Sequence, residues 1–315
     1  MRAVLMRRFG GPEVLEIAEV PEPQPRRGHL LVDVTRAGVN YADLHARGDT
    51  YLAPVALPYI PGNEIVGTTE DGRRVAALTQ GGGYAEKALA HSLVSWHIPD
   101  DVTDDQAAAL ALQGNSAWHL LFTAARLTSG ERVVIPAAAG GLGSLAVQLA
   151  QRAGAKVIAL ASSDEKRRTA LSLGADAVVD SSTADGLTER ILEAAGGPVQ
   201  VALEMTGGAT FHATLAAVAP RGRLVVYGYA SGEHATAPTA LLMEKSITVT
   251  GFWLPHLYTE RNALPTSMNA LFSAVGSGEL RPLVGEVLPL AEAARAHESL
   301  AARTSTGKIL LRPSS

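Results

Sequence analysis

The chain has 315 residues, a length that suits about two domains, and its 47% hydrophobic content and formal net charge of −4 are typical of an ordinary globular protein. It has no basic domain, and no apolar stretch approaches the roughly 18 residues of a membrane span, so we expect a cytoplasmic protein that binds neither nucleic acid nor membrane. The lack of Cys excludes disulfides, iron–sulfur clusters and thiolate zinc sites, and the nine His residues form no H-E-x-x-H motif, so we predict no metal.

Residues 1–100 predict an antiparallel β region, because apolar alternation is punctuated by Pro and Gly with little helical periodicity. A short polar helix or turn is expected within it at 40–48, where Asp43 and Arg47 are four residues apart and could pair. Asp71-Gly72 is the strongest hairpin signal. The expected strands are 14–20, 30–39, 65–69, 73–78 and 84–90.

After Thr103 the pattern becomes helical. Apolar and Ala-rich segments at 104–112 and 117–125 predict helix, and the polar residues 113–116 are expected to interrupt it. This stretch carries the chain into a second region with a different pattern.

Residues 131–150 change from a strand pattern to a helix pattern around a turn of small residues. The run 131–135 fits a strand buried on both faces, and apolar residues recur at helical spacing from Leu142 onward. Between them Ala138, Gly140 and Gly143 give A-x-G-x-x-G, one glycine short of the dinucleotide fingerprint. Such a turn presents the N–H groups of a helix N-terminus to a diphosphate, but glycines also occur there simply to let a helix pack closely on a sheet.

Strands then alternate with helices of about ten residues, which predicts a parallel sheet of the Rossmann type, doubly wound by right-handed crossovers. The expected strands are 156–160, 177–179, 199–203, 223–227 and 247–252, and the expected helices are 164–173, 187–195 and 209–218.

The end of the second of these strands bears on the choice of cofactor. An acidic residue there would receive the ribose hydroxyl of NAD, whereas this chain has Ser162 and Ser163 followed by Lys166, Arg167 and Arg168. Hydroxyls and cations suit a ribose 2′-phosphate, so we expect NADPH. In the alternative interpretation, Ser163 caps a helix, the cations form a solvated face, and Asp164 takes the ribose of NAD.

The tail beyond residue 253 predicts helices at 262–275 and 291–302 and strands at 284–288 and 308–311. These strands have no place in a six-stranded Rossmann order, so we expect the tail to return to the first domain. The expected domains are therefore 1–118 with 254–315, and 119–253.

Several motifs in this order and spacing give a resemblance that covers nearly the whole chain. They are Asn40-Tyr41-Ala42-Asp43 with Arg47, Gly48 and Tyr51; Pro61-Gly62-Asn63-Glu64; Gly82-Gly83-Tyr84-Ala85-Glu86; Asn115-Ser116-Ala117-Trp118; Ala138-Ala139-Gly140-Gly141-Leu142-Gly143; Leu173-Gly174-Ala175-Asp176; and Thr306-Gly307-Lys308-Ile309. The chain resembles the medium-chain dehydrogenase/reductase superfamily, and within it the zinc-independent quinone oxidoreductase branch. Where zinc-dependent members carry Cys, His and Glu ligands, this chain has Asn63-Glu64 and no Cys.

The resemblance implies an α/β fold, with a Rossmann domain and a β-rich, GroES-like catalytic domain, that holds NADPH along the carboxyl ends of the Rossmann strands. It also implies a homodimer formed through the edge strand near 247–250. The implied cofactor-binding residues are Asn40, Ser116, Ala139, Gly140, Gly141, Leu142, Gly143, Ser162, Ser163, Lys166, Ser181, Met205, Thr206, Gly207, Tyr227, Gly228, Phe252, Trp253 and Arg303.

The chemistry expected of such a site is hydride transfer to an electron-poor acceptor. No metal is expected, and no Tyr-x-x-x-Lys pair is present to donate a proton, so a quinone or an α,β-unsaturated carbonyl is favoured over a simple ketone. The catalytic candidates are Tyr51, Asn40 and Asp43, with Tyr51 as a possible hydrogen-bond donor to the substrate and Asp43 as a residue that positions the others. In the alternative interpretation these residues are structural: Asn40 closes a turn, Asp43 only pairs with Arg47, and Tyr51 is a surface or core residue. An enoyl reductase for thioesters or polyketides and a non-catalytic NADPH-binding protein remain as alternative functions.

Overall fold

The computed structural model describes residues 1–313, which form two compact units. Unit 1 contains Met1–Asn115 and the tail from Leu257, and unit 2 contains Ser116–His256. The expected boundaries at 118/119 and 253/254 lie within three residues of these limits.

Unit 2 contains a six-stranded parallel sheet in the order β10-β9-β8-β11-β12-β13. Numbered from the first strand of this unit, the order is 3-2-1-4-5-6, that of a doubly wound dinucleotide-binding sheet, as expected. The direction of winding reverses between β8 and β11, where such sheets bind ligands outside the carboxyl ends of the strands. The strands are β8 (Arg132–Ile135), β9 (Lys156–Ala161), β10 (Ala177–Asp180), β11 (Val199–Glu204), β12 (Val218–Val226) and β13 (Thr248–Gly251).

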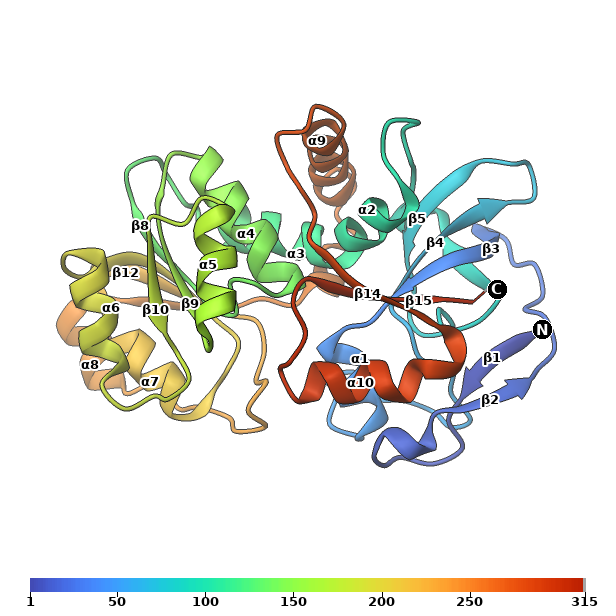
Figure 1. The fold of residues 1–315 in the computed structure, drawn as a ribbon, viewed down its shortest axis with the longest axis horizontal. Coiled ribbons are helices and arrows are strands. Elements are labelled where there is room, and N and C mark those ends of the chain that lie inside the picture. The colour runs from blue at the N-terminus through green and yellow to red at the C-terminus, as the bar shows by residue number, and fades with distance from the viewer. Residues whose placement is uncertain (314–315) are drawn as a thin grey trace. The chain divides into compact units, whose positions relative to one another are not determined.

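Helices of unit 2 connect these strands and pack against them (Figure 1). Their apolar sides cover a core that includes Val134, Ile158, Leu203 and Leu224, all at most 2% exposed. The helices are α4 (Gly141–Arg152), α5 (Asp164–Ser172), α6 (Leu187–Ala195), α7 (Gly208–Ala216) and α8 (Thr239–Lys245), with the short helices η4 (His119–Ala124) and η5 (Leu254–Leu257) near the unit's limits.

Unit 1 is built on a seven-stranded sheet in which β14, β15, β3, β4, β5 and β7 follow one another and β6 also pairs with β3. Strands β14 and β15 come from the tail, and β15 pairs with β3, so the tail returns to the first unit as expected. A two-stranded sheet of β1 and β2 completes the set. The strands are β1 (Arg2–Leu5), β2 (Glu16–Glu19), β3 (His29–Gly38), β4 (Glu64–Thr69), β5 (Arg74–Leu78), β6 (Lys87–His91), β7 (Ser95–His97), β14 (Val284–Pro289) and β15 (Lys308–Arg312).

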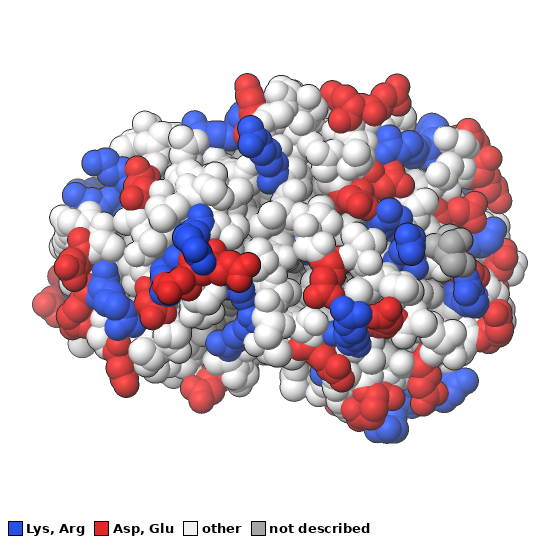
Figure 2. Space-filling model, viewed as in Figure 1, with Lys and Arg blue, Asp and Glu red and all other residues white. Residues whose placement is uncertain are grey.

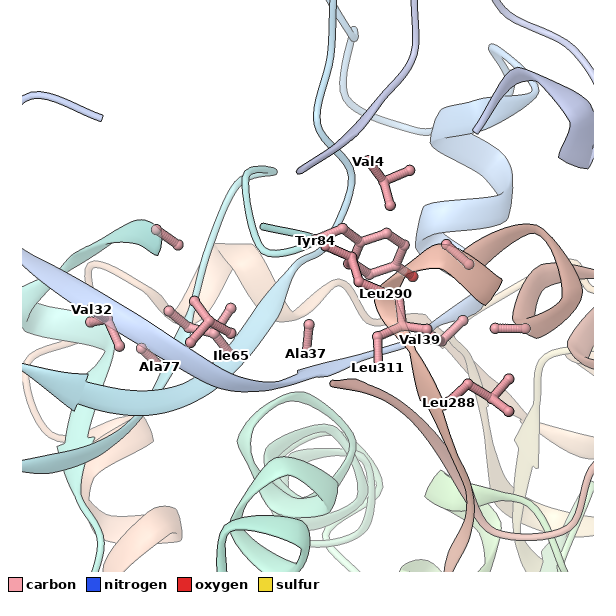
Figure 3. Close-up of a cluster of buried hydrophobic side chains, with 14 of the residues drawn as sticks. Val4, Val32, Ala37, Val39, Ile65, Ala77, Tyr84, Leu288, Leu290 and Leu311 are labelled. Atoms are coloured by element: carbon pink, nitrogen blue, oxygen red, sulfur yellow. The ribbon is translucent and has the colours of Figure 1, made fainter. Parts of the chain in front are cut away.

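The core of unit 1 joins residues from both ends of the chain. Val4, Ile65 and Leu311 are each at most 1% exposed, and the ring of Tyr84 lies among these apolar side chains (Figure 3). Each of these strands therefore depends on the others for burial. The helices of unit 1 are α1 (Tyr41–Arg47), α2 (Asp104–Ala109), α9 (Ala263–Gly276) and α10 (Ala293–Ala301), with the short helices η1 (Pro12–Val14), η2 (Ser92–Val94) and η6 (Leu290–Glu292).

Two local predictions were wrong. The expected strand at 14–20 begins only at Glu16, because Pro12 starts the short helix η1 that ends at Val14. The expected interruption at 113–116 is instead continuous helix, in which the π-helical segment η3 (Leu110–Gly114) leads into α3 (Asn115–Trp118). The side chain of Asn115 donates to the carbonyl of Ala111 at 2.7 Å, so this polar group is satisfied within the helix that it was expected to break.

Acidic and basic side chains are interspersed over the face of the molecule shown in Figure 2. Within residues 1–313, none of the helices has the length and apolar character that crossing a bilayer requires.

Candidate functional site

The predicted site residues fall in both units, and in unit 2 all of them except Ser116 lie at or after the turn between β8 and α4. Gly140 is the N-cap of α4, with extended backbone and no side chain to cap the helix. The first N–H groups of a helix have no partner within it. The turn therefore leaves these donors, together with the positive end of the helix dipole, to a ligand.

Gly143 lies where the first turn of α4 crosses the backbone of the preceding loop. A Cβ at this position would stand 2.2 Å from the carbonyl oxygen of Ala137, so only glycine fits. Ala137 itself has the left-handed φ of +46°, whereas Ala138 lacks a positive φ and is fully buried. This explains why Ala138 can replace the first glycine of the dinucleotide fingerprint. The residue with left-handed backbone is Ala137, one position earlier, so Ala138 does not need the wider φ range of glycine.

The polar residues after β9 lie around the start of α5. Ser163 caps this helix and accepts the Lys166 N–H at 3.3 Å, as the alternative interpretation expected. A hydroxyl that accepts a hydrogen bond can still donate its own proton, so the cap does not exclude a phosphate contact. Ser162 is exposed, and burial lowers the pKa of the half-buried Lys166. The N–H of Ser181, after β10, donates to the carbonyl of Ala161 at 3.2 Å, which places Ser181 beside the end of β9.

Further along the same edge of the sheet, the loop after β11 is held by a carboxylate that the sequence analysis did not assign. Glu204 is 1% exposed and accepts the N–H groups of Thr206 at 2.8 Å and Gly207 at 3.1 Å. Burial raises the pKa of Glu204. The signal in the sequence was an acidic residue ending an apolar strand.

The residues after β12 and β13 gather near this loop. The N–H of Tyr227 donates to the Glu204 carbonyl, and that of Ala230 donates to the Met205 carbonyl at 2.7 Å. The N–H of Phe252 donates to Val226 at 2.8 Å, and the ring of Trp253 packs edge-on against that of His256. Gly228 follows Tyr227 directly, and the predicted residue Ser116 is buried in α3, at the start of unit 2.

In unit 1, Asn40 and Asp43 form the start of α1 and contact each other directly. The Asn40 N–H donates to Asp43 Oδ2 at 2.9 Å, and Asp43 also accepts Asn63 Nδ2 at 2.7 Å and the Tyr84 hydroxyl at 3.1 Å. The expected pair between Asp43 and Arg47 is therefore wrong. Arg47 points elsewhere and donates to the carbonyl of Gly10 at 3.1 Å.

Arg47, His297, Tyr84 and Asp43 form a chain of hydrogen bonds with a fixed direction. Arg47 can only donate, so Nδ1 of His297, at 3.3 Å, is the acceptor and Nε2 carries the proton. Nε2 lies 3.2 Å from the hydroxyl oxygen of Tyr84, whose own proton points to Asp43. Burial, and then the charge of Arg47, lowers the pKa of His297 to about 3, which keeps this imidazole neutral.

A buried ion pair lies next to this chain. Lys308 and Glu64 are both fully enclosed and form a salt bridge, and Lys308 Nζ also donates to the Val39 carbonyl at 3.1 Å and to Asn40 Oδ1 at 2.8 Å. The second carboxylate oxygen of Glu64 accepts the N–H of Leu112 at 2.8 Å. Every oxygen of this carboxylate is thus engaged within unit 1.

The side chain of Asn40 is held from several directions. Oδ1 accepts from Lys308 and from Gln113 Nε2 at 3.2 Å, while Nδ2 donates to Glu64 at 2.8 Å and to the Gly38 carbonyl at 3.4 Å. The supporting residues Glu64, Tyr84 and Lys308 belong to motifs that carry the resemblance, but the sequence alone predicts no function for them. Gln113 and His297 lie in none of these motifs, and no pattern in the sequence pointed to them.

The predicted residues Tyr51 and Arg303 also belong to unit 1. Tyr51 is half-buried in the loop after α1 and is near Tyr59 and Tyr258, whose pKa values are raised chiefly by burial and further by neighbouring groups including Tyr51. Arg303 is exposed and hydrogen-bonds the hydroxyl of Tyr41.

Comparison with known proteins agrees with this arrangement. Residues 26–83 match the alcohol dehydrogenase GroES-like domain family, and residues 141–273 match the zinc-binding dehydrogenase family. The chain has no Cys, and within residues 1–313 no three side chains of His, Asp or Glu come together as a candidate metal site.

Individual relatives match over almost the full length. The quinone oxidoreductase of Pseudomonas aeruginosa is 35% identical over 97% of both chains, and quinone oxidoreductase 1 of Escherichia coli is 33% identical over 97% of this chain and 98% of its own. Among solved structures, the quinone oxidoreductase of Thermus thermophilus, also determined with NADPH, has a TM-score of 0.90 and 37% identity over 99% of this chain and all of its own. That of E. coli in complex with NADPH has a TM-score of 0.92 and 30% identity over the same shares.

The buried carboxyl of Asp43 predicts a pH-dependent contribution to stability. Burial raises its pKa from 3.8 to about 7, so the native state binds the proton more tightly than the unfolded chain. The protonated Asp43 therefore makes its largest contribution to the free energy of unfolding below about pH 4. This contribution decreases as the pH rises through about 7, and at higher pH it no longer changes. His297 has a lowered pKa, so its own contribution to stability increases with pH and opposes that of Asp43. Because His297 is present in both wild type and Asp43→Asn, the difference in stability between these two proteins isolates the contribution of Asp43.

Urea unfolding at a series of pH values measures this difference. We expect the stability of wild type relative to Asp43→Asn to decline between about pH 4 and about pH 7. Asp185→Asn removes the same charge from an exposed position and should show no such decline. A difference between wild type and Asp43→Asn that does not vary with pH would contradict the prediction.

Proposed function

The chain belongs to the medium-chain dehydrogenase/reductase superfamily, in its quinone oxidoreductase branch, and from this premise we propose that it is a zinc-independent, NADPH-dependent reductase of quinones or other α,β-unsaturated carbonyls. The observation that carries the proposal is the turn after β8. There the close approach at Gly143 and the uncapped N-terminus of α4 provide donors for a diphosphate at the point where the sheet reverses its winding.

The residues of unit 2 fit NADPH along one edge of the sheet. Residues 139–143 suit its diphosphate, and Ser162, Ser163, Lys166 and Ser181 suit its 2′-phosphate. The loops after β11, β12 and β13, with Met205, Thr206, Gly207, Tyr227, Gly228, Phe252 and Trp253, follow in the direction of the nicotinamide. When bound, NADPH supplies a hydride from C4 of its nicotinamide.

The side chains of unit 1 are proposed to hold the reacting groups in place. Asn40 is proposed as a nicotinamide-binding residue, and its longest hydrogen bond, 3.4 Å to the Gly38 carbonyl, is the one a ligand can most easily replace. Asp43 acts through Asn40 and is a positioning residue. Arg303, in the tail, and Ser116, in unit 2, are proposed as further cofactor-binding residues.

Tyr51 is proposed to donate a hydrogen bond to the substrate oxygen. Hydride addition to a quinone or to the β-carbon of an enone places negative charge on that oxygen, and a donor aimed at it stabilises the transition state. Tyr51 is half-buried, so it is less screened by water than a surface hydroxyl.

Transfer of the labelled hydride tests the proposed function. Purified protein is given NADPH or NADH deuterated at either face of C4, with a panel of quinones, enones and enoyl thioesters. We expect a primary isotope effect from one face only, deuterium at the β-carbon of enone products, and preference for NADPH.

Each other result overturns the proposal in a specific way. Turnover confined to thioesters would indicate an enoyl reductase, and tight NADPH binding without any turnover would indicate a non-catalytic binding protein. Absence of binding by either nucleotide would remove the oxidoreductase assignment altogether.

Substitution of Tyr51 by Phe tests the proposed donor. The variant keeps the ring and loses the hydroxyl, so kcat should fall about 10- to 100-fold while the Kd for NADPH is unchanged. Tyr59→Phe removes a neighbouring hydroxyl and is the comparison. Equal losses in the two variants, or no loss in Tyr51→Phe, would exclude Tyr51 as the donor.

Substitution of Gly143 by Ala tests the diphosphate site. The new Cβ meets backbone 2.2 Å away, so the start of α4 must shift, and we expect the Kd for NADPH, measured by fluorescence titration, to rise about 10-fold or more. Gly251→Ala adds a Cβ that meets nothing within 4 Å and should bind NADPH as wild type does. Undiminished binding by Gly143→Ala would place the diphosphate elsewhere.

The homodimer also remains a proposal. Strand β13 (Thr248–Gly251) is the last strand of its sheet and, within residues 1–313, pairs with β12 alone, so its outer edge can add a strand from a second copy. Sedimentation of the purified chain at twice the monomer mass would support this assembly.

A further inference from the structure

Arg167, in the first half of α5, is surrounded by residues that adjoin the proposed 2′-phosphate site. Its guanidinium pairs with Asp164, lies 3.2 Å from Asp180 Oδ1, and donates to the Ala161 carbonyl at 3.2 Å. The side chain is only 20% exposed, although it carries a full charge. One group therefore joins the start of α5 to the ends of β9 and β10.

Each of these three partners is next to a proposed phosphate ligand in the sequence. Ala161 precedes Ser162, Asp164 follows Ser163, and Asp180 precedes Ser181. From the sequence, Arg167 is expected to form one cationic cluster with Lys166 and Arg168. In the structure, Arg167 is instead committed to protein partners.

The pairing of Arg167 with two carboxylates changes the charge that a bound 2′-phosphate would meet. Asp164 is 86% exposed and Asp180 is 46% exposed, so both carboxylates lie at the surface of the site. A free carboxylate after the second strand favours the ribose hydroxyls of NAD and repels the dianionic 2′-phosphate of NADPH. Arg167 compensates both carboxylates at once.

A second cation, Arg190, holds the loop that follows, and its charge also helps to lower the pKa of Asp180, after the hydrogen bonds from Ser182 and the charge of Arg167. Arg190 donates to the carbonyls of Asp180 at 3.0 Å, Thr183 at 2.8 Å and Asp185 at 2.7 Å. These contacts fix the backbone after β10. In the salt bridges of the described residues, the carboxylates of Asp164 and Asp180 pair with Arg167.

We propose that Arg167 is a positioning residue that sets the preference of this site for a 2′-phosphorylated cofactor, by neutralising Asp164 and Asp180 rather than by contacting the phosphate. The inference rests on the proposed function, since it presupposes that NADPH binds at this edge of the sheet. It differs from a merely structural role, because loss of Arg167 changes the discrimination between two cofactors that differ only in the 2′-phosphate.

The experiment measures the Kd of NADPH and of NADH by fluorescence titration at low and high salt. Arg167→Gln should raise the Kd for NADPH about 10-fold and that for NADH less than about 2-fold, and added salt should reduce the difference. Adding Asp164→Asn to Arg167→Gln should recover most of the lost NADPH affinity, because it removes a carboxylate that the arginine had compensated. Arg167→Lys keeps the charge and should keep the preference.

Lys156→Gln is the matched control. It removes a positive charge from an exposed side chain at the first residue of β9, whereas the proposed site follows the last residue of that strand, and both Kd values should change less than about 3-fold. Thermal unfolding of each variant shows whether the fold is retained. If Arg167→Gln does not fold, Asp164→Asn in the wild-type background decides the matter: it should bind NADPH at least as tightly as wild type.

Two results would overturn the inference. Equal weakening of NADPH and NADH in Arg167→Gln would show a purely structural role, and unchanged affinity for both would show no role. Wild-type protein that binds neither nucleotide would instead overturn the proposed function, and the two failures are therefore distinguishable.

Discussion

The buried pair of Lys308 and Glu64 is the interaction on which unit 1 depends. It connects the last strand of the chain to the start of β4, across 244 residues of sequence, and both side chains are fully enclosed. Removing one partner of such a pair leaves an uncompensated buried charge, which costs about 3–5 kcal/mol. The pair is also specific, because Lys308 reaches Asn40 and the Val39 carbonyl only when β15 is in register beside β3.

A comparable constraint operates in unit 2 through backbone contact alone. The left-handed conformation at Ala137 and the absence of a side chain at Gly143 let the loop and the first turn of α4 touch. The strain at Ala137 is maintained by the buried residues that follow it. Unit 1 thus fixes its site by charge between residues far apart in sequence, and unit 2 by close packing within a single turn.

The sequence predicted those features that depend on local pattern. The order of strands and helices in unit 2 followed from apolar periodicity and glycine punctuation, and the return of the tail followed from a count of strands. The helix through Asn115 was missed because its polar side chain bonds to the helix backbone, a geometry that composition does not reveal. The pair of Asp43 with Arg47 was wrong because both residues found partners far away in sequence, Tyr84 and His297 among them. Local spacing cannot show which long-range partner a side chain takes. Arg167 differs, because its partners Ala161, Asp164 and Asp180 lie within 13 residues of it.

The direction of the chain from Arg47 to Asp43 limits how protons move in unit 1. Arginine does not release its proton, and the neutral imidazole of His297 is oriented by it. Such a row of side chains cannot act as a wire that carries protons inward from the Arg47 end, since its first member has none to give. Protons therefore do not enter this row at Arg47, and the row serves to hold Asp43 in place.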